Sequence, residues 1–213
     1  FGWAYSTDDD FGDSHRNRAF RFTLLNQGDV TLSVQRTGVG NTLLPGFSIF
    51  SGLSHLPPDA LAHDSSPLSL SYLASLGGTQ PKQGAFFALG DWSIGNDDVY
   101  NTPGDPLSGI AVPASLRTLV YMGNAADGSS ANYGSAAGIN GDGNADGYIS
   151  ATFNLPAGDY TIIVGGGEYL TTPPAGPYTS YGVNVGLSVV PEPSSFALTA
   201  IAGLGLALRR RRN

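Results

Sequence analysis

The chain has 213 residues, which is enough for one domain with a sizeable hydrophobic core, and it contains no cysteine. The absence of Cys excludes disulfide bonds, thiolate catalysis, and zinc or iron–sulfur centres held by Cys. Only 13% of the residues are charged, whereas 30 Gly and 14 Pro occur along the chain, which argues against long helices and coiled coils. We therefore expect many short elements joined by turns.

Charge is distributed unevenly. The formal net charge is −7, although four of the ten Lys and Arg residues stand together at positions 209–212. The rest of the chain is therefore strongly acidic, and this argues against nucleic acid as a partner, because phosphate binding needs clustered Lys and Arg on the folded surface. Hard cations such as calcium are better electrostatic partners for such a body.

The N-terminal segment combines aromatic and acidic residues. Residues 1–7 carry aromatic rings ahead of the first strand, and we expect them to pair with the sheet edge of a neighbouring subunit, which would build a head-to-tail fibre. An acidic cluster follows, with Arg16, Arg18 and Arg21 close behind it. Close carboxylates repel unless a cation or Arg relieves them, so the cluster is either a second cation or Arg-paired site or an exposed loop. Its members are Asp8, Asp9, Asp10 and Asp13.

The first two predicted strands alternate apolar and polar residues with a period of two. Residues 19–25 place Phe20, Phe22 and Leu24 on one face, and residues 29–36 do the same with three aliphatic side chains. The short link 26–28 ends in Gly, which can adopt a positive φ. This pattern predicts a hairpin between the two strands.

Further β-rich runs continue along the chain. The pair 148–155 and 160–165 is joined by Pro-Ala-Gly-Asp, in which Pro fixes φ and Gly can become left-handed, so we predict a second hairpin here. No helical pattern of useful length occurs before the C-terminal tail. Residues 1–190 are therefore predicted to form one all-β domain, an antiparallel β-sandwich of jelly-roll type. The remaining predicted strands are 47–51, 84–89, 116–123 and 181–189.

Acidic loops with aromatic residues offer a binding alternative. Asp91, Asp97 and Asp98 surround Trp92, and like the N-terminal cluster this segment is either a cation or Arg-paired site or an exposed loop. Rings beside carboxylates are also typical of a sugar-binding face. A carbohydrate-binding module is accordingly the first alternative function.

An enzyme is the weaker hypothesis. The chain has no Gly-x-Ser-x-Gly turn to present a Ser nucleophile, and its body has a single Glu, Glu168, where glycoside hydrolysis needs paired carboxylates. His55 and His63 are interpreted as polar loop residues more readily than as a metal site. We predict no catalytic residues, and a secreted glycan-active enzyme ranks below the binding module.

One motif has the spacing of a calcium loop. Oxygen-bearing side chains at every second position, followed by Gly, match the first half of such a loop in the segment Asp-Gly-Asn-Ala-Asp-Gly at 142–147. An EF-hand is excluded, because its twelfth position is Phe153 and not Glu. The alternative is a solvated turn before a strand. If calcium binds, a carboxylate from elsewhere completes the site, and the ligands within the motif are Asp142, Asn144, Asp146 and the carbonyl of Tyr148.

The C-terminus consists of three unlike segments in order. Pro191, Glu192 and Pro193 precede an apolar stretch at 196–208, which ends in a block of four arginines. As a helix the stretch would measure about 20 Å, whereas a bilayer span needs about 20 residues. It is apolar all round, so we predict a short helix outside the sandwich and marginal as a permanent membrane anchor. The block consists of Arg209, Arg210, Arg211 and Arg212, and it places the body outside the cytoplasm by the positive-inside rule.

This order of segments resembles the PEP-CTERM sorting signal of Gram-negative bacteria, so residues 191–213 are assigned to sorting and not to the body. The resemblance implies a cleaved N-terminal signal peptide, transient insertion in the inner membrane, and processing near Pro-Glu-Pro by an exosortase, a membrane-bound cysteine protease. The chain begins at Phe1 and not at Met, which is consistent with a removed leader or a trimmed sequence.

The resemblance also implies a function. It indicates a secreted or cell-surface protein that accompanies exopolysaccharide in biofilm or floc formation. We therefore expect a non-enzymatic extracellular matrix protein that acts by adhesion or self-assembly, with calcium joining its acidic loops.

Overall fold

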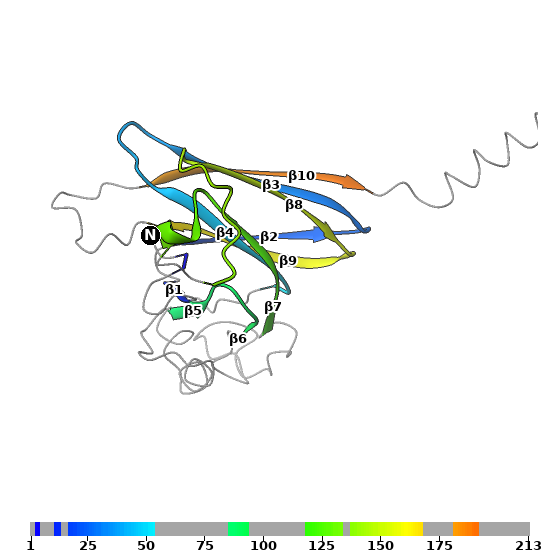
Figure 1. Ribbon diagram of the computed structural model, residues 1–213. Helices are drawn as coiled ribbons and strands as arrows, with labels where there is room; N and C mark the ends of the chain where they lie inside the picture. The colour runs from blue at the N-terminus through cyan, green and yellow to red at the C-terminus, as the bar shows by residue number, and fades with distance from the viewer. Residues whose placement is uncertain are drawn as a thin grey trace, which may run out of the picture.

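Figure 1 shows the computed structural model of the chain as a ribbon. The structure describes residues 3–4, 11–13, 17–53, 85–93, 118–133, 137–167 and 181–191. These residues form β-strands and one short 3₁₀ helix at Ser130–Tyr133, so the predicted all-β class is confirmed. The strands are β1 (Phe11–Asp13), β2 (Arg18–Leu24), β3 (Gly28–Thr37), β4 (Leu44–Ser51), β5 (Ala85–Phe87), β6 (Trp92–Ser93), β7 (Thr118–Ala126), β8 (Tyr148–Leu155), β9 (Gly158–Gly167) and β10 (Gly182–Pro191).

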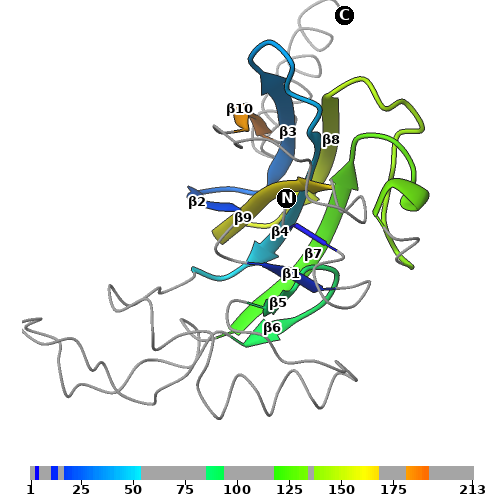
Figure 2. The ribbon, with the colours of Figure 1, turned by 90° about the vertical axis from the view of Figure 1, so that its left-hand side faces the viewer.

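The strands pair antiparallel in two main sheets. One sheet has three strands in the order β10-β3-β8, and the other has five in the order β2-β9-β4-β7-β6. A separate short pair joins β1 to β5. The turned view in Figure 2 shows the two sheets as layers, with β10 and β2 on the same side of them.

The main core lies between these layers. In β3 the side chains of Val30, Leu32 and Val34 are buried, whereas Asp29 and Gln35 are exposed, as the period of two requires. The cluster is completed across the gap by Phe47 and Ile49 of β4 and by Tyr160, Ile162 and Val164 of β9. Alternation in the sequence therefore places two apolar sheet faces against each other.

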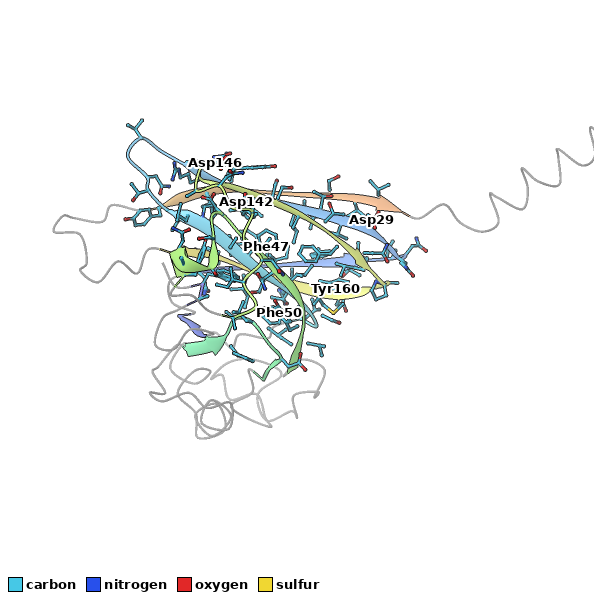
Figure 3. The ribbon with its side chains drawn as sticks, in the orientation of Figure 1. Asp29, Phe47, Phe50, Asp142, Asp146 and Tyr160 are labelled. Carbon is cyan, nitrogen blue, oxygen red and sulfur yellow. The ribbon has the colours of Figure 1, made fainter. Side chains whose placement is uncertain are left out.

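The five-stranded sheet is buried on its other face as well. β4 and β9 are buried along almost their whole length, which is why their sequences are apolar runs without alternation. Figure 3 shows Phe47 and Phe50 of β4 at different levels of the molecule, the first in the main core and the second in another cluster. That second cluster contains Trp3, Ala4, Phe50, Ala88, Leu119, Ala126, Tyr133 and Ile163.

Trp3 shows how the N-terminal segment is used. Its side chain is fully buried, its ring meets that of Tyr133 edge-on at a centroid distance of 5.4 Å, and its Nε1 donates a hydrogen bond of 2.8 Å to Ser48 Oγ. A large apolar ring with a satisfied N–H is most stable inside its own fold. Because Trp3 and Ala4 fill the core of their own chain, the prediction that residues 1–7 serve a neighbouring subunit is wrong.

Both predicted hairpins are also wrong. β2 pairs with β9 whereas β3 pairs with β10 and β8, so residues 25–27 carry the chain from one sheet to the other. Residues 156–157 do the same between β8 and β9. The physical reason is that both strands at each turn direct their apolar faces toward the one core, so they lie opposite each other across it and do not share a ladder.

Several predictions fall outside the described residues. They include the C-terminal apolar helix at 196–208, the loop residues His55, His63, Asp97 and Asp98, and the first residues of the predicted strands 84–89 and 116–123. Within the described ranges, no helix is long and apolar enough to cross a membrane. The jelly-roll connectivity and the division into 1–190 and 191–213 stay predictions.

Candidate functional site

The predicted calcium loop is fastened alongside the end of β7. Ala126 N donates to Asn140 O at 2.9 Å, Asp142 N donates to Ala126 O at 3.1 Å, and Gly143 N donates to Gly128 O at 2.8 Å. Figure 3 shows Asp142 and Asp146 toward one end of the molecule, with Asp29 toward the other. The loop is thus held by backbone bonds to a buried strand end, and its side chains are left at the surface.

The three oxygen-bearing side chains of the motif are all exposed. Asp142 Oδ1 accepts hydrogen bonds from Gly128 N and Asn144 N, both at 2.9 Å, and Asp146 Oδ1 accepts one from Tyr148 N at 3.0 Å. These are the local turns that Asp favours ahead of a strand. No described residue donates to the second oxygen of either carboxylate.

Gly147 joins the loop to the sheet. Its N donates to Asp127 Oδ2 at 2.7 Å, and its O accepts from Arg36 N at 2.9 Å and from Gln35 Nε2 at 3.0 Å. The residue has φ +87°, and a Cβ atom there would lie 2.1 Å from Arg36 Nε. Gly is therefore required twice, for its left-handed backbone and for the close approach of Arg36. Tyr148 follows as the first residue of β8, opposite Gln35.

Asp127 is the site residue that the sequence analysis missed. It follows β7 directly, its side chain is fully buried, and its Oδ1 and Oδ2 accept hydrogen bonds from Asp146 N at 3.0 Å and Gly147 N at 2.7 Å. A carboxylate from elsewhere was expected to complete the loop, and Asp127 is a carboxylate that contacts it, through hydrogen bonds from two backbone N–H groups of the loop. The only sequence signal was an Asp-Gly pair after a predicted strand.

Burial dominates the electrostatics around Asp127. Removal from water raises the pKa of its carboxyl, the two backbone hydrogen bonds oppose this rise, and the charges of Asp146 and Asp142 add to it. Burial of the neighbouring Tyr133 raises the pKa of its hydroxyl in the same way. This hydroxyl donates a hydrogen bond to Asp127 O at 3.0 Å. Three carboxylates therefore interact at this end of the sandwich.

The loop has the donor atoms of a hard-cation site, but its side chains are not arranged around a common point. Within the described residues, no three His, Asp or Glu side chains are arranged so that they could hold a metal ion. The donor set nevertheless consists of oxygens at every second position, which is the set that calcium prefers. If an ion binds, Asp142 and Asp146 have to turn their second carboxylate oxygens toward it, and Asn144 its amide oxygen.

The other predicted site residues are not brought to this loop by the described structure. Asp91 lies before β6, and its Oδ1 accepts a hydrogen bond of 2.8 Å from Tyr121 N, which is a structural role. Asp13 lies in β1, of which only the backbone is described. Outside the described residues are Asp8, Asp9, Asp10, Asp97, Asp98, His55, His63, Glu168, Glu192, Pro193 and the arginines at 209–212.

The last described strand overlaps the predicted sorting signal. β10 extends to Pro191, so the first Pro of Pro-Glu-Pro is the last residue of the sheet. Residues 189–212 match the family model described as the PEP-CTERM protein-sorting motif. The chain carries a PEP-CTERM sorting signal. This confirms the resemblance drawn from the sequence and indicates an exported protein that is a substrate of an exosortase.

Comparison of the chain with solved structures finds similar folds. CorA, described as a surface-associated copper-binding protein important in copper acquisition by Methylomicrobium album BG8, has a TM-score of 0.53 and 18% identity over 89% of each chain. MopE, a secreted protein of Methylococcus capsulatus in a mercury-soaked crystal, has a TM-score of 0.47 and 18% identity, over 89% of this chain and 82% of its own. No curated protein matches the chain. The likeness to CorA supports the all-β fold.

Proposed function

We propose that the protein is a non-enzymatic surface protein that an exosortase processes after export and that then acts in the exopolysaccharide matrix by adhesion or self-assembly. The sorting signal at 189–212 is the observation that carries this proposal. In the proposal, residues 196–208 insert transiently in the inner membrane as an apolar helix, and the arginines at 209–212 stay on the cytoplasmic side. The body, a sandwich of jelly-roll type, is the delivered part.

Processing can be tested in a Gram-negative host that has an exosortase. We expect mass spectrometry of the released protein to show that the end after Pro193 is lost. A variant with Pro191, Glu192 and Pro193 all changed to Ala should accumulate uncleaved in the membrane fraction. A variant with Asp159→Asn, a change on the exposed surface of the body, should be processed normally. Released protein that keeps its full C-terminus would contradict the proposal.

The matrix role has its own test. The processed protein should remain with cells that make exopolysaccharide and should enter the medium from cells that lack it. Equal retention by both strains would contradict the matrix part of the proposal while leaving export and processing intact.

Within this function we propose that the loop at 142–147 binds calcium. Support comes from three exposed oxygen-bearing side chains at every second position, from two carboxylates whose outer oxygens accept no hydrogen bond from the described chain, and from the neighbouring Asp127. An exposed site with few ligands suits the millimolar calcium found outside cells. Calcium would relieve the repulsion among the three carboxylates.

Thermal unfolding in calcium and in EDTA tests this site. An ion that binds only the folded state stabilises it by about 1.4 kcal/mol when its concentration is about ten times Kd. We expect the midpoint to rise with millimolar calcium for the wild type and for Asp29→Asn, an exposed control near the opposite end of the body. The rise should be lost when Asp142 and Asp146 are both changed to Asn. An equal rise in all three proteins would contradict binding at the loop.

Copper is the alternative ion, because CorA is described as copper-binding. The same titration with copper separates the two metals. A copper response that survives the loop variant would direct attention to His15, His55 and His63, which lie outside the described residues.

A carbohydrate-binding module is the second candidate function, and one surface favours it. The outer face of the three-stranded sheet presents hydroxyl and amide side chains in rows. Thr31 and Thr152 are hydrogen-bonded to each other at 2.8 Å. Tyr148, which follows the loop at 142–147, is 42% exposed. Rings stack on sugar C–H faces, and amides and hydroxyls exchange hydrogen bonds with sugar hydroxyls. The polar and aromatic residues of this face are Asp29, Thr31, Ser33, Gln35, Tyr148, Ser150, Thr152, Asn154, Asn184 and Ser188.

Affinity electrophoresis with the host's purified polysaccharide tests this face. We expect Tyr148→Ala to abolish the retardation of the protein, whereas Val120→Ala, which removes a similarly exposed side chain from the other sheet, should leave it unchanged. Retardation of the Tyr148 variant equal to that of the wild type would contradict binding at this face.

A further inference from the structure

One side of the sandwich leaves core-facing residues uncovered. Leu187 and Val189 of β10 lie opposite the buried Leu32 and Val30, and residues directly opposite in a ladder share a face. They nevertheless are 44% and 36% exposed. Phe20 of β2 lies opposite the buried Ile162 in the other sheet and is 41% exposed. These three side chains, here called the apolar strip, belong to β10 and β2, which Figure 2 shows on the same side of the two layers.

The strip adjoins an edge strand without the usual protection. β10 is the end strand of its sheet, it is paired to β3 without a register shift over its ten residues, and it contains no charged residue. Exposed edges normally carry Lys, inward-pointing charges or bulges that stop them from pairing with another chain. Apart from Pro191 at its very end, β10 has none of these features, so its edge is suited to pair with another strand.

Charge argues against the other edge on this side as the pairing strand. β2, the other edge on this side, carries Arg18 and Arg21, so two β2 edges would bring like charges together. Two β10 edges bring together no charge at all. We propose that β10 pairs antiparallel with β10 of a second copy of this chain across a two-fold axis at Leu187.

The geometry of such a pair buries the part of the strip that belongs to β10. In an antiparallel pair of identical strands, an even register places residues of the same parity on one face, so the core faces of both copies lie on the same side. The result is a continuous six-stranded sheet, β8-β3-β10-β10-β3-β8, in which Leu187 of one copy lies opposite Leu187 of the other and Val189 lies opposite Val185 of the other. A two-fold interface of this kind is closed, so it predicts a dimer and not the fibre that the N-terminal segment suggested.

This inference deepens the self-assembly part of the proposed function and rests on it only for its biological purpose. Pairing of β10 needs neither polysaccharide nor exosortase, so its test can fail independently of the tests given for processing and matrix retention.

The absence of Cys permits a clean crosslinking experiment. Ser188→Cys places a thiol on β10 close to the proposed axis, and Ser150→Cys places one on the same outer face of the same sheet but on β8, at its far edge. The full chain, kept in mild detergent so that residues 196–208 stay dispersed, is treated with a short bismaleimide at micromolar protein concentration. We expect a covalent dimer from Ser188→Cys and at least ten times less from Ser150→Cys.

A charged substitution in the apolar strip provides a second test of the proposed pairing. Adding Leu187→Lys to Ser188→Cys should reduce crosslinking at least ten-fold, because like charges would face each other, whereas Val120→Lys, at a site of the matched exposure of 45%, should not. Near-ultraviolet circular dichroism confirms that each variant is folded. Equal crosslinking from positions 188 and 150, crosslinking unaffected by Leu187→Lys, or a monomer for Ser188→Cys would each overturn the proposal.

Discussion

Asp127 combines two conflicting requirements in one side chain. It is fully buried, yet both of its oxygens are needed to accept hydrogen bonds from Asp146 N and Gly147 N. Asp127→Asn replaces one acceptor with an NH₂ group and leaves a backbone N–H without a partner. We expect a loss of about 1–3 kcal/mol in the free energy of unfolding, measured with urea. Asp159→Asn at the surface should cost less than about 0.5 kcal/mol.

The pKa of Asp127 also predicts a pH dependence. Burial raises this pKa above its usual 3.8, so the folded state binds the proton more tightly than the unfolded state does. Stability then falls as the pH rises from 3.8 through the raised pKa. Compared with Asp127→Asn, the wild type should therefore lose free energy of unfolding over this interval, measured by urea titrations in EDTA at several pH values. Parallel curves for the two proteins would show that Asp127 titrates normally.

Trp3 tests whether the N-terminal segment belongs to its own fold. Trp3→Ala leaves a large cavity beside Tyr133 and removes the bond to Ser48 Oγ, so we expect a loss of about 3–5 kcal/mol. Trp3→Phe lowers the free energy of unfolding for two reasons, the smaller ring and the lost hydrogen bond to Ser48 Oγ. We expect the lost hydrogen bond to contribute about 1 kcal/mol of this loss. If Trp3→Ala left the urea midpoint unchanged, the packing of Trp3 on its own core would be wrong.

At the scale of elements, two glycines of the loop at 142–147 can be compared directly, because both have a left-handed backbone. Gly143 and Gly147 have φ +84° and +87°, but only a Cβ at Gly147 would meet another side chain, that of Arg36. Gly143→Ala should cost about 1 kcal/mol for its left-handed backbone. Gly147→Ala should cost about 1–3 kcal/mol more, because the loop can no longer approach β3. Equal urea midpoints for the two variants would contradict the close contact with Arg36.

Strand positions could be predicted from the sequence, but strand partners could not. Alternation located β8 at exactly 148–155 and found β3 to within a residue at each end, because one buried face imposes a period of two. The turn at 156–157 has residues that also suit a hairpin. What decides against a hairpin is that Phe22 of β2 stacks on Tyr160 of β9 at 5.1 Å while β8 pairs with β3, and such distant choices leave no mark on the turn itself.

The loop at 142–147 shows the same difference between local contacts, which could be predicted from the sequence, and long-range contacts, which could not. The local spacing of Asp142, Asn144 and Asp146 was readable in the sequence, because it concerns neighbours in the chain. Asp127 was not, because it joins them only after β7 and β8 are placed. Long-range contacts also explain the misplaced role of Trp3, whose partner Ser48 is 45 residues away.

At the scale of the whole molecule, the boundary between body and tail is a testable property. The described body ends with β10, which pairs with β3 as far as Pro191 and contributes Val183 and Val185 to the packing around the main core. Truncation after Pro191 keeps all of these contacts, so we expect the free energy of unfolding to change by less than about 0.5 kcal/mol. Truncation after Tyr181 removes a complete strand and exposes the edge of β3, so it should prevent folding or lower the urea midpoint strongly. A large loss of stability on truncation after Pro191 would mean that residues 192–213 are part of the fold, and the assignment of those residues to sorting alone would be wrong.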